Sequence, residues 1–453
     1  MKKLILITDD EYIRNYLDSA AFSAIEDQNT FYLAAERLTH RAALLSKKNF
    51  LGFIADVSWR RNLCLDLLYI QMVRHRNRSR TFGFRLRRFR KILQWKYKLL
   101  GLPIMEGMAT AFIFKKLGVH QQMKKILEWI KPELIIVPSA VTAPLGIDAL
   151  ILAQQKGIKT LFLIDGWDNL SSKSVFPILP DYLAVWGKQS VEHGFKIHGI
   201  SKDRTFTIGT PRFDHYFTAE PRDLKSPYSF SYVLFAGNSL PFDEISALKI
   251  IDQEIEAMGV KDFKVVYRPH PWRQKRSCFD VFKEEDYRHV VIDVPVKEAY
   301  QHRQKEGNPE FKSYLPPLEY YPALLNSALF VISPLSTMMV EAAIFNTPVL
   351  AICYDDGYHL TSPHNAYKYY EHFAGIENVH GFTLCREKND LGFCFRKMVE
   401  GYTAQKKDPR IKEGIRYFLH FDENTYNQRL KSVCDRIAGQ RLEEYSYSHQ
   451  MSE

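Results

Sequence analysis

The sequence predicts an α/β protein with two doubly wound domains, and three observations lead to that prediction. The chain has 453 residues, enough for two domains of about 200 residues each. Residues 329–352 run in the order apolar strand, polar turn, helix, apolar strand, which is typical of a parallel βαβ unit. Strands and helices alternate through residues 130–217, and the alternation restarts after residue 231. We therefore expect two parallel sheets covered by helices.

The N-terminal domain is predicted to cover residues 1–217. Its expected strands are short apolar runs that end in polar or glycine-containing turns. These strands are Lys3–Thr8, Leu51–Val57, Leu134–Val137, Lys159–Ile164, Tyr182–Trp186 and Arg204–Ile208. Residues 11–50 alternate in a helical manner, and further helices are expected over Met123–Lys131 and over Ile147–Lys156, before Gly157.

The polar segment 218–231 is predicted to link the domains, because it combines Pro, Ser and charged residues. The second domain is expected over 232–405, and a C-terminal helical segment over 406–453. The expected strands of the second domain are Tyr232–Ala236, Phe263–Tyr267, Val290–Asp293, Leu329–Ile332 and Val349–Ile352. Its expected helices are Glu244–Met258, one beginning at Pro322–Ser327, Met338–Phe345, and a long stretch within 407–438.

Composition limits the class of protein. The hydrophobic fraction of 46% and charged fraction of 25% are those of a globular protein. The six cysteines form no C-x-x-C pair and are interpreted as reduced thiols. No apolar run approaches the length of a membrane span, and the first residues do not resemble a signal peptide. We predict a cytoplasmic protein, peripheral on the inner face of the cytoplasmic membrane.

The membrane part of that prediction comes from residues 74–98, where eleven of 25 residues are Arg or Lys. Three interpretations compete: a solvated helix face, a surface for anionic lipid or a lipid-linked polyanionic acceptor, and a nucleic-acid groove. The second is favoured, since aromatic side chains can enter the interface while basic ones pair with phosphates. No nucleic-acid-binding motif accompanies the segment, so no nucleic acid is expected as a partner. The interleaved apolar residues are Phe82, Phe84, Phe89, Ile92 and Trp95.

Polar turns follow the predicted strands at their carboxyl ends, the edge where α/β sheets bind ligands. In the second domain these turns are rich in hydrogen-bond donors, which suits a phosphate or pyrophosphate. Glu341, about one turn into the helix, could accept hydrogen bonds from two neighbouring hydroxyls such as those of a ribose. The candidate donors are Gly237, Asn238, Ser239, Arg268, His270, Ser333, Ser336 and Thr337.

In the first domain the turn after Lys159–Ile164 carries two carboxylates, Asp165 and Asp168. A carboxylate at a strand end can act as a general base that takes a proton from an acceptor hydroxyl. Each also has a structural interpretation, Asp165 as a turn former before Gly166 and Asp168 as a helix cap.

The ordered set of turns resembles a known family. The Gly237–Ser239 turn, the strand ending on His270-Pro271, and Ser333–Glu341 before a Thr-Pro-Val strand resemble the GT-B glycosyltransferases. His270-Pro271 with Ser336-Thr337 resembles in particular the bacterial sialyltransferases, the capsule Kdo transferases and the CDP-glycerol glycerophosphotransferases. Residues 208–214 also resemble the UDP-N-acetylglucosamine 2-epimerases. The resemblance implies two Rossmann-like domains facing across a cleft, and a cytidine-activated donor.

The resemblance also implies roles for single residues. His270 would contact the donor phosphate and stabilise the leaving nucleotide, while Ser336 and Thr337 bind the same phosphate. Glu341 would hold the ribose hydroxyls. Asp165 resembles an Asp in the Asp-Asp-Gly turn of the sialyltransferases that acts as the base, but the order Asp-Gly-Trp-Asp here leaves the base open between Asp165 and Asp168.

The predicted function is a metal-independent glycosyltransferase without a cofactor. It would move a sugar from a nucleotide-activated donor, preferably a CMP-sugar of the sialic acid or Kdo type, to a capsule, lipopolysaccharide or other surface glycan or glycolipid. The alternatives are a CDP-glycerol-type polyol-phosphate transferase, a UDP-sugar 2-epimerase-like isomerase and a nucleotide-sugar-binding regulator.

Overall fold

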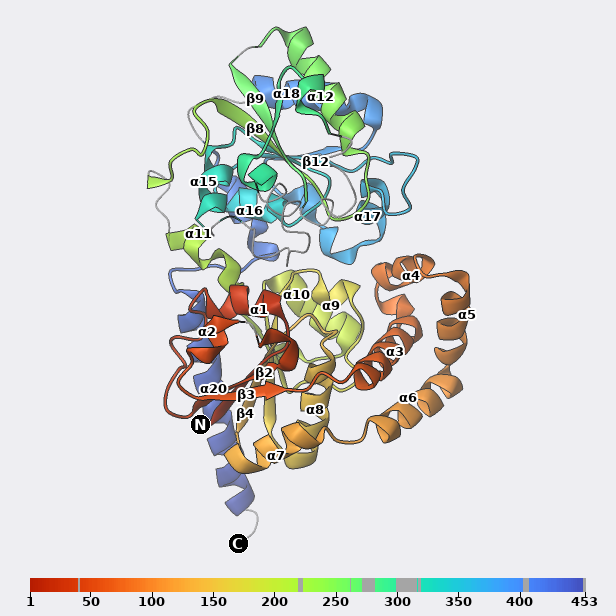
Figure 1. Ribbon diagram of the computed structural model, residues 1–453, viewed down its shortest axis with the longest axis vertical. Coiled ribbons are helices and arrows are strands. Elements are labelled where there is room, and N and C mark those ends of the chain that lie inside the picture. Colours follow the sequence, from red (N-terminus) through yellow and green to blue (C-terminus); the bar gives the residue numbers. More distant parts are fainter. Residues whose placement is uncertain are drawn as a thin grey trace. The chain divides into compact units, whose positions relative to one another are not determined.

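The structure is a computed structural model of the chain, and it describes residues 1–39, 41–218, 223–260, 262–270, 282–298, 316, 319–401 and 407–450. The chain forms two compact units (Figure 1). Unit 1 comprises Met1–Asp214 and Arg416–Glu453, and unit 2 comprises His215–Ile415. The chain therefore leaves unit 1, builds unit 2 and then returns to unit 1.

Unit 1 is built on a sheet of seven parallel strands in the order β3-β2-β1-β4-β5-β6-β7. The winding direction changes between β1 and β4, so their carboxyl ends mark a topological switch point. The strands are β1 (Lys3–Ile7), β2 (Thr30–Ala35), β3 (Phe50–Ile54), β4 (Leu134–Ser139), β5 (Lys159–Ile164), β6 (Tyr182–Val185) and β7 (Thr205–Thr207).

Helices pack around this sheet, and α3, α4, α5 and α6 form a helical group beside it (Figure 1). They are α1 (Asp10–Tyr12), α2 (Ala42–Leu45), α3 (Ser58–Arg74), α4 (Arg80–Arg87), α5 (Lys91–Leu100), α6 (Pro103–Leu117), α7 (Gln121–Ile130), α8 (Pro144–Lys156), α9 (Asn169–Ser172), α10 (Lys188–His193) and α20 (Tyr426–Gln450), while α11 (Asp214–Thr218) lies at the junction with unit 2.

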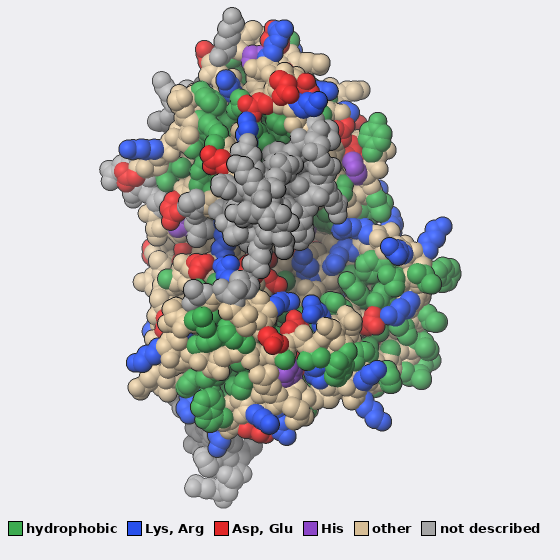
Figure 2. All heavy atoms as spheres, viewed as in Figure 1, with side chains coloured by type: hydrophobic (Ala, Val, Ile, Leu, Met, Phe, Trp, Pro, Cys, Tyr) green, Lys and Arg blue, Asp and Glu red, His purple; other side chains and the backbone are tan. Residues whose placement is uncertain are grey.

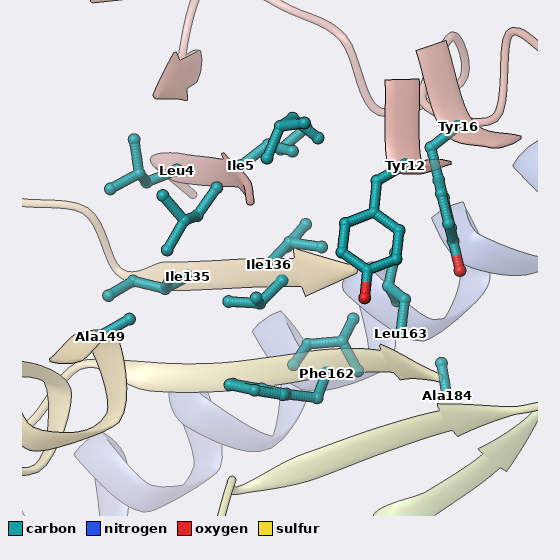
Figure 3. Close-up of a cluster of buried hydrophobic side chains, with 14 of the residues drawn as sticks. Leu4, Ile5, Tyr12, Tyr16, Ile135, Ile136, Ala149, Phe162, Leu163 and Ala184 are labelled. Carbon is teal, nitrogen blue, oxygen red and sulfur yellow. The ribbon is translucent and has the colours of Figure 1, made fainter. Parts of the chain in front are cut away.

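The core of unit 1 consists of apolar strand residues that are buried on both faces of the sheet. Ile5, Ile136 and Phe162 come from neighbouring strands and are almost completely buried. Tyr12 and Tyr16 close the core at the carboxyl end of β4, where Figure 3 shows their rings beside the strand. Fully burying such side chains contributes about 1.5–3 kcal/mol each. The core therefore ends in two tyrosines directly beneath the edge that carries the polar turns.

The basic segment 74–98 differs from its sequence-based interpretation. Helices α4, α5 and α6 pack on α3, and α3 packs on α8. Phe82 and Phe84 are buried, and Phe89 is partly buried against an apolar cluster that includes Leu67 and Phe82. The expectation that these aromatic rings face a membrane is therefore wrong for Phe82 and Phe84, because both side chains are buried inside unit 1. Ile92 and Trp95 are exposed.

Unit 2 contains a sheet of six parallel strands in the order β10-β9-β8-β11-β12-β13. Its switch point lies between β8 and β11. The strands are β8 (Ser231–Ala236), β9 (Phe263–Arg268), β10 (Val290–Ile292), β11 (Val331–Ser333), β12 (Val349–Ile352) and β13 (Phe382–Cys385). The helices are α12 (Glu244–Met258), α15 (Tyr320–Ser327), α16 (Met338–Ile344), α17 (Pro363–Tyr369), α18 (Leu391–Gly401) and α19 (Arg410–Gly414).

After unit 2, residues 416–437 complete unit 1. This segment passes very close to Gly187: a Cβ added to Gly187 would lie 2.6 Å from the carbonyl carbon of Phe418. At Gly209, whose φ is +73°, a Cβ would sit 2.5 Å from the carbonyl oxygen of His420. Helix α20 then inserts apolar side chains into the core of the first sheet. These side chains are Tyr426, Leu430, Val433, Cys434 and Ile437.

The two-unit α/β architecture agrees with the predicted fold class, and the strands differ in detail. Strand β2 lies within residues 11–50, which were expected to be helical, and β13 was not expected at all. The long helix expected within 407–438 is instead the short α19, an irregular stretch and α20. Residues 416–450, predicted as part of a separate C-terminal segment, belong to unit 1.

Candidate functional site

Three of the predicted polar turns come together in unit 2. Strands β9, β8 and β11 are adjacent, so the turns after Arg268, after Ala236 and after Ser333 lie side by side at the carboxyl edge. Two of these turns, Gly237–Ser239 and Ser333–Thr337, flank the switch point. In open parallel sheets this is the position at which ligands bind.

Asn238 ties the two flanking turns together. Its side chain is buried, and its Nδ2 donates to the carbonyl oxygens of Pro334 at 2.6 Å and Leu335 at 2.7 Å. Leu335 is a buried residue with φ of +60°, a conformation that non-glycine residues adopt only when the surroundings hold them in it. The Asn238 amide thus fixes the backbone immediately before Ser336 and Thr337.

Gly237 lies where the turn after β9, which carries His270, comes close to the turn after β8. A Cβ there would lie 2.9 Å from Oε2 of Glu244 and 3.1 Å from the backbone nitrogen of His270. Glu244, in the first turn of α12, is buried and accepts from the backbone N–H of Asn238 at 3.0 Å and from the Tyr267 hydroxyl at 2.6 Å. Sequence analysis missed Glu244, because its role depends on three elements that only the fold brings together.

The hydroxyls predicted to meet a phosphate lie on the turn after β11. The Oγ atoms of Ser333 and Ser336 are 2.9 Å apart. Ser336 and Thr337 are half-buried, and the Thr337 side chain makes no capping hydrogen bond to α16. His270 lies two residues after the end of β9 and is also half-buried, whereas Pro271, the second residue of the His-Pro motif, lies outside the described residues. His270 and these hydroxyl residues therefore lie on turns at one edge of the sheet.

Glu341, predicted to bind a ribose, is a buried carboxylate that accepts from the Tyr216 hydroxyl at 2.8 Å. Tyr216 precedes the second sheet in the chain and was not identified from the sequence.

Arg268 was predicted as a phosphate donor, and the structure shows it engaged inside unit 2. Its buried guanidinium forms an ion pair with Asp293 and donates to the Tyr321 hydroxyl at 2.9 Å. Asp293 is fully buried and also accepts from the Tyr228 hydroxyl at 2.6 Å. These contacts hold the end of β9 against the segments around Tyr228 and Tyr321, and the phosphate-binding role of Arg268 stays a prediction.

In unit 1, Asp165 lies at the carboxyl end of β5, next to the switch point. Its buried carboxylate accepts from Nδ2 of Asn15 at 2.9 Å, and its backbone carbonyl accepts from Nε1 of Trp186 at 2.9 Å. Burial, followed by the negative charge of Glu11, raises the pKa of the Asp165 carboxyl to about 7, against the opposing effects of Arg212 and Asn15. A carboxyl group with a pKa near neutrality can exchange a proton at physiological pH.

Asp168 has different surroundings. Its carboxylate is partly exposed and accepts from the Ser172 Oγ at 2.7 Å and from Nδ2 of Asn169 at 3.1 Å, with the Lys173 Nζ 3.7 Å away. These contacts are all within five residues and organise the turn before and around α9. Of the two candidate bases, Asp165 is buried and Asp168 is partly exposed.

Within the described residues, no group of three or more His, Cys, Asp or Glu side chains is arranged to hold a metal ion. No cofactor-binding residue was predicted from the sequence.

Comparisons with known proteins define the fold class. No protein-family model matches the chain. No curated protein matches it either. Several solved structures do match: S. aureus MnaA with UDP has a TM-score of 0.52 at 10% identity, with 95% of each chain covered. A putative UDP-N-acetylglucosamine 2-epimerase from Listeria monocytogenes has a TM-score of 0.52 at 14% identity, with 96% of each chain covered.

The UDP-GlcNAc 2-epimerase from Methanocaldococcus jannaschii gives a TM-score of 0.50 at 14% identity, covering 92% of this chain and 98% of that one. These identities establish a shared fold and no more. The chain has the GT-B-like two-domain α/β fold, as the sequence predicted.

Proposed function

We propose that this chain is a nucleotide-sugar-dependent glycosyltransferase. The observation that carries the proposal is the convergence of the Gly237, His270 and Ser336 turns at the switch point of unit 2. An imidazole, two hydroxyls and closely approaching backbone suit the phosphate of an activated donor. A CMP-sugar of the sialic acid or Kdo type is the preferred donor, and a surface glycan or glycolipid is the acceptor. The proposal includes no metal ion and no cofactor.

In the proposed reaction an acceptor hydroxyl oxygen attacks the anomeric carbon of the donor sugar. The bond from that carbon to the phosphate oxygen breaks, and the nucleotide leaves with the bonding electron pair. His270, Ser336 and Thr337 stabilise the charge that develops on the departing phosphate. Asp165 takes the proton of the acceptor hydroxyl, for which a pKa of about 7 is well matched.

Glu341 is the proposed partner of the donor's ribose. It would exchange its hydrogen bond with the Tyr216 hydroxyl for one with a ribose hydroxyl, or accept from both. A carboxylate offers about four lone-pair positions, so one carboxylate can accept from more than one hydroxyl.

The first test is a calorimetric titration of the purified chain with CMP, CDP, UDP and GDP. The measurement is repeated on His270→Ala, with His380→Ala as the matched control, since His380 is an exposed histidine of the same unit whose ring nitrogen contacts Asp408 at 2.7 Å. Loss of a charge-assisted phosphate contact should weaken CMP binding about ten- to a hundredfold. The control should bind CMP like the wild type.

Tight CMP binding that collapses only in His270→Ala supports the proposal. A chain that binds none of the four nucleotides refutes it. Incubation with CMP-sugars and glycan acceptors then measures transfer, which Asp165→Asn should abolish while CMP affinity remains.

A UDP-sugar 2-epimerase is the second candidate, favoured by the fold likeness to structures described as UDP-GlcNAc 2-epimerases. An epimerase needs no acceptor, so UDP-GlcNAc alone should yield its C2 epimer. Preference for UDP in the titration together with that product would replace the transferase proposal. A glycerophosphate product from CDP-glycerol would instead identify a polyol-phosphate transferase.

A further inference from the structure

Helices α5 and α6 present apolar side chains to the outside of unit 1. Figure 2 shows hydrophobic side chains gathered over these two helices, with Lys and Arg side chains among them. Six of the apolar side chains, which together we call the outer apolar face, are each more than half exposed. They are Ile92, Trp95, Leu99, Ile104, Met108 and Phe112.

The outer apolar face is not needed for packing within unit 1. The opposite sides of the same helices bury Tyr97, Ile113 and Leu117 in the cluster with α3. Residues 92, 95 and 99 recur at helical spacing on α5, and 104, 108 and 112 do so on α6, so each helix has a second apolar stripe. Folded monomers seldom leave such a contiguous patch exposed unless it binds something.

The charge around this face identifies the kind of partner. From residue 67 to residue 127 the chain has fifteen Lys or Arg and one acidic residue, Glu106. The Glu106 carboxylate accepts from Nε2 of Gln71 at 2.6 Å and from the Thr110 hydroxyl at 2.9 Å. Exposed cations, including Lys91 and Lys98, flank the apolar side chains. Apolar side chains surrounded by positive charge complement lipid tails beneath anionic headgroups.

We propose that the outer apolar face of α5 and α6 docks unit 1 onto an anionic lipid bilayer. The apolar stripes enter the boundary between headgroups and acyl chains, and Lys91, Lys98 and Lys115 meet lipid phosphates. Trp95 lies at headgroup depth, where an indole ring is favoured, and the Lys98 Nζ is 5.8 Å from its ring centroid.

The geometry favours docking in the plane of the membrane. Among the described residues, no single helix is long and apolar enough to cross a bilayer. Helices α5 and α6 are long and apolar enough to cross a bilayer only when they are counted as one segment, and the chain bends by 93° between them. Both helices also stay packed on α3. An interfacial position satisfies these constraints without unfolding the pair.

The test uses flotation of the full chain with vesicles of phosphatidylcholine alone or mixed with phosphatidylglycerol. One variant, Trp95→Ser/Leu99→Ser/Phe112→Ser, removes apolar contacts, and a second, Lys91→Gln/Lys98→Gln/Lys115→Gln, removes charge. The control, Trp129→Ser/Phe195→Ser, alters two exposed aromatic residues elsewhere on unit 1. Each Lys or Arg near an anionic surface contributes about fivefold to the partition coefficient.

The wild type and the control should float with anionic vesicles and bind neutral ones more weakly. The first two variants should lose about tenfold or more in partitioning while CD spectra and melting temperatures stay those of the wild type. Absence of wild-type flotation would overturn the proposal. Undiminished flotation of the serine variant would also overturn it. A third contrary result would be a wild-type dimer in sedimentation that the serine variant dissociates while its flotation stays unchanged, because the face would then join two copies of the chain.

Discussion

Replacing Asp165 by Asn should stabilise the protein at neutral pH and leave it nearly unchanged in acid. In the folded chain, burial and then the charge of Glu11 raise the pKa of the Asp165 carboxyl from 3.8 to about 7. The unfolded chain therefore releases this proton near pH 4, whereas the folded chain keeps it until about pH 7. Between these values the unfolded state binds fewer protons, so stability falls as pH rises.

The difference in pKa corresponds to about 4 kcal/mol when complete. Asn keeps an oxygen to accept from Asn15 and gains an N–H that can donate to the Glu11 carboxylate. We expect Asp165→Asn to raise the free energy of unfolding by about 2–4 kcal/mol at pH 8 and by less than about 1 kcal/mol at pH 4. Urea unfolding followed by fluorescence at both pH values measures the change.

The control is Asp168→Asn, because the Asp168 carboxylate is partly exposed and accepts from Ser172, four residues further along the chain. It should change the unfolding free energy by less than about 1 kcal/mol at either pH. Equal effects of Asp165→Asn at pH 4 and pH 8 would refute the reasoning, since nothing would then link the carboxyl pKa to folding.

Three further substitutions test unit 2. Asn238→Ala leaves two buried carbonyl groups without their donor and should cost about 2–4 kcal/mol in urea unfolding, with weaker CMP binding in titration. Gly237→Ala places a Cβ 2.9 Å from Glu244, so we expect a loss of about 1–3 kcal/mol in the same unfolding measurement. Asp293→Ala leaves the Arg268 charge buried without its carboxylate and should cost about 3–5 kcal/mol, whereas the double variant with Arg268→Met should recover part of that loss.

Local sequence signals predicted the repeating βαβ pattern well where strands are short apolar runs between glycine or proline turns. Helix α12 and strand β12 have the residues that the sequence indicated. Strand β2 was missed because Thr30–Ala35 lies inside residues 11–50, whose alternation was interpreted as helical. The aromatic residues at 82 and 84 were misinterpreted, since nearby arginines suggested a surface although the rings are buried.

In the candidate site, too, some residues could be predicted from the local sequence and others could not. The turns that carry Gly237, His270 and Ser336 follow strands that periodicity detects, so their common edge could be predicted. Glu11 and Glu244 could not be found in this way. Each stands beside other acidic residues, Glu11 after Asp9-Asp10 and Glu244 after Asp243, and nothing local sets it apart. Its importance comes from a partner that the fold brings near, such as Asp165 for Glu11.

The return of the chain to unit 1 imposes an order on its biosynthesis. Residues 1–214 leave the ribosome before the helix that supplies Tyr426 and Leu430 to their core exists. All of unit 2 is made in the interval and can fold first, because domains fold as units during synthesis. Gly187 and Gly209 meanwhile keep open the space that Phe418 and His420 later fill. Residues 1–214 must therefore wait, incompletely packed, until residues 416–437 have been made.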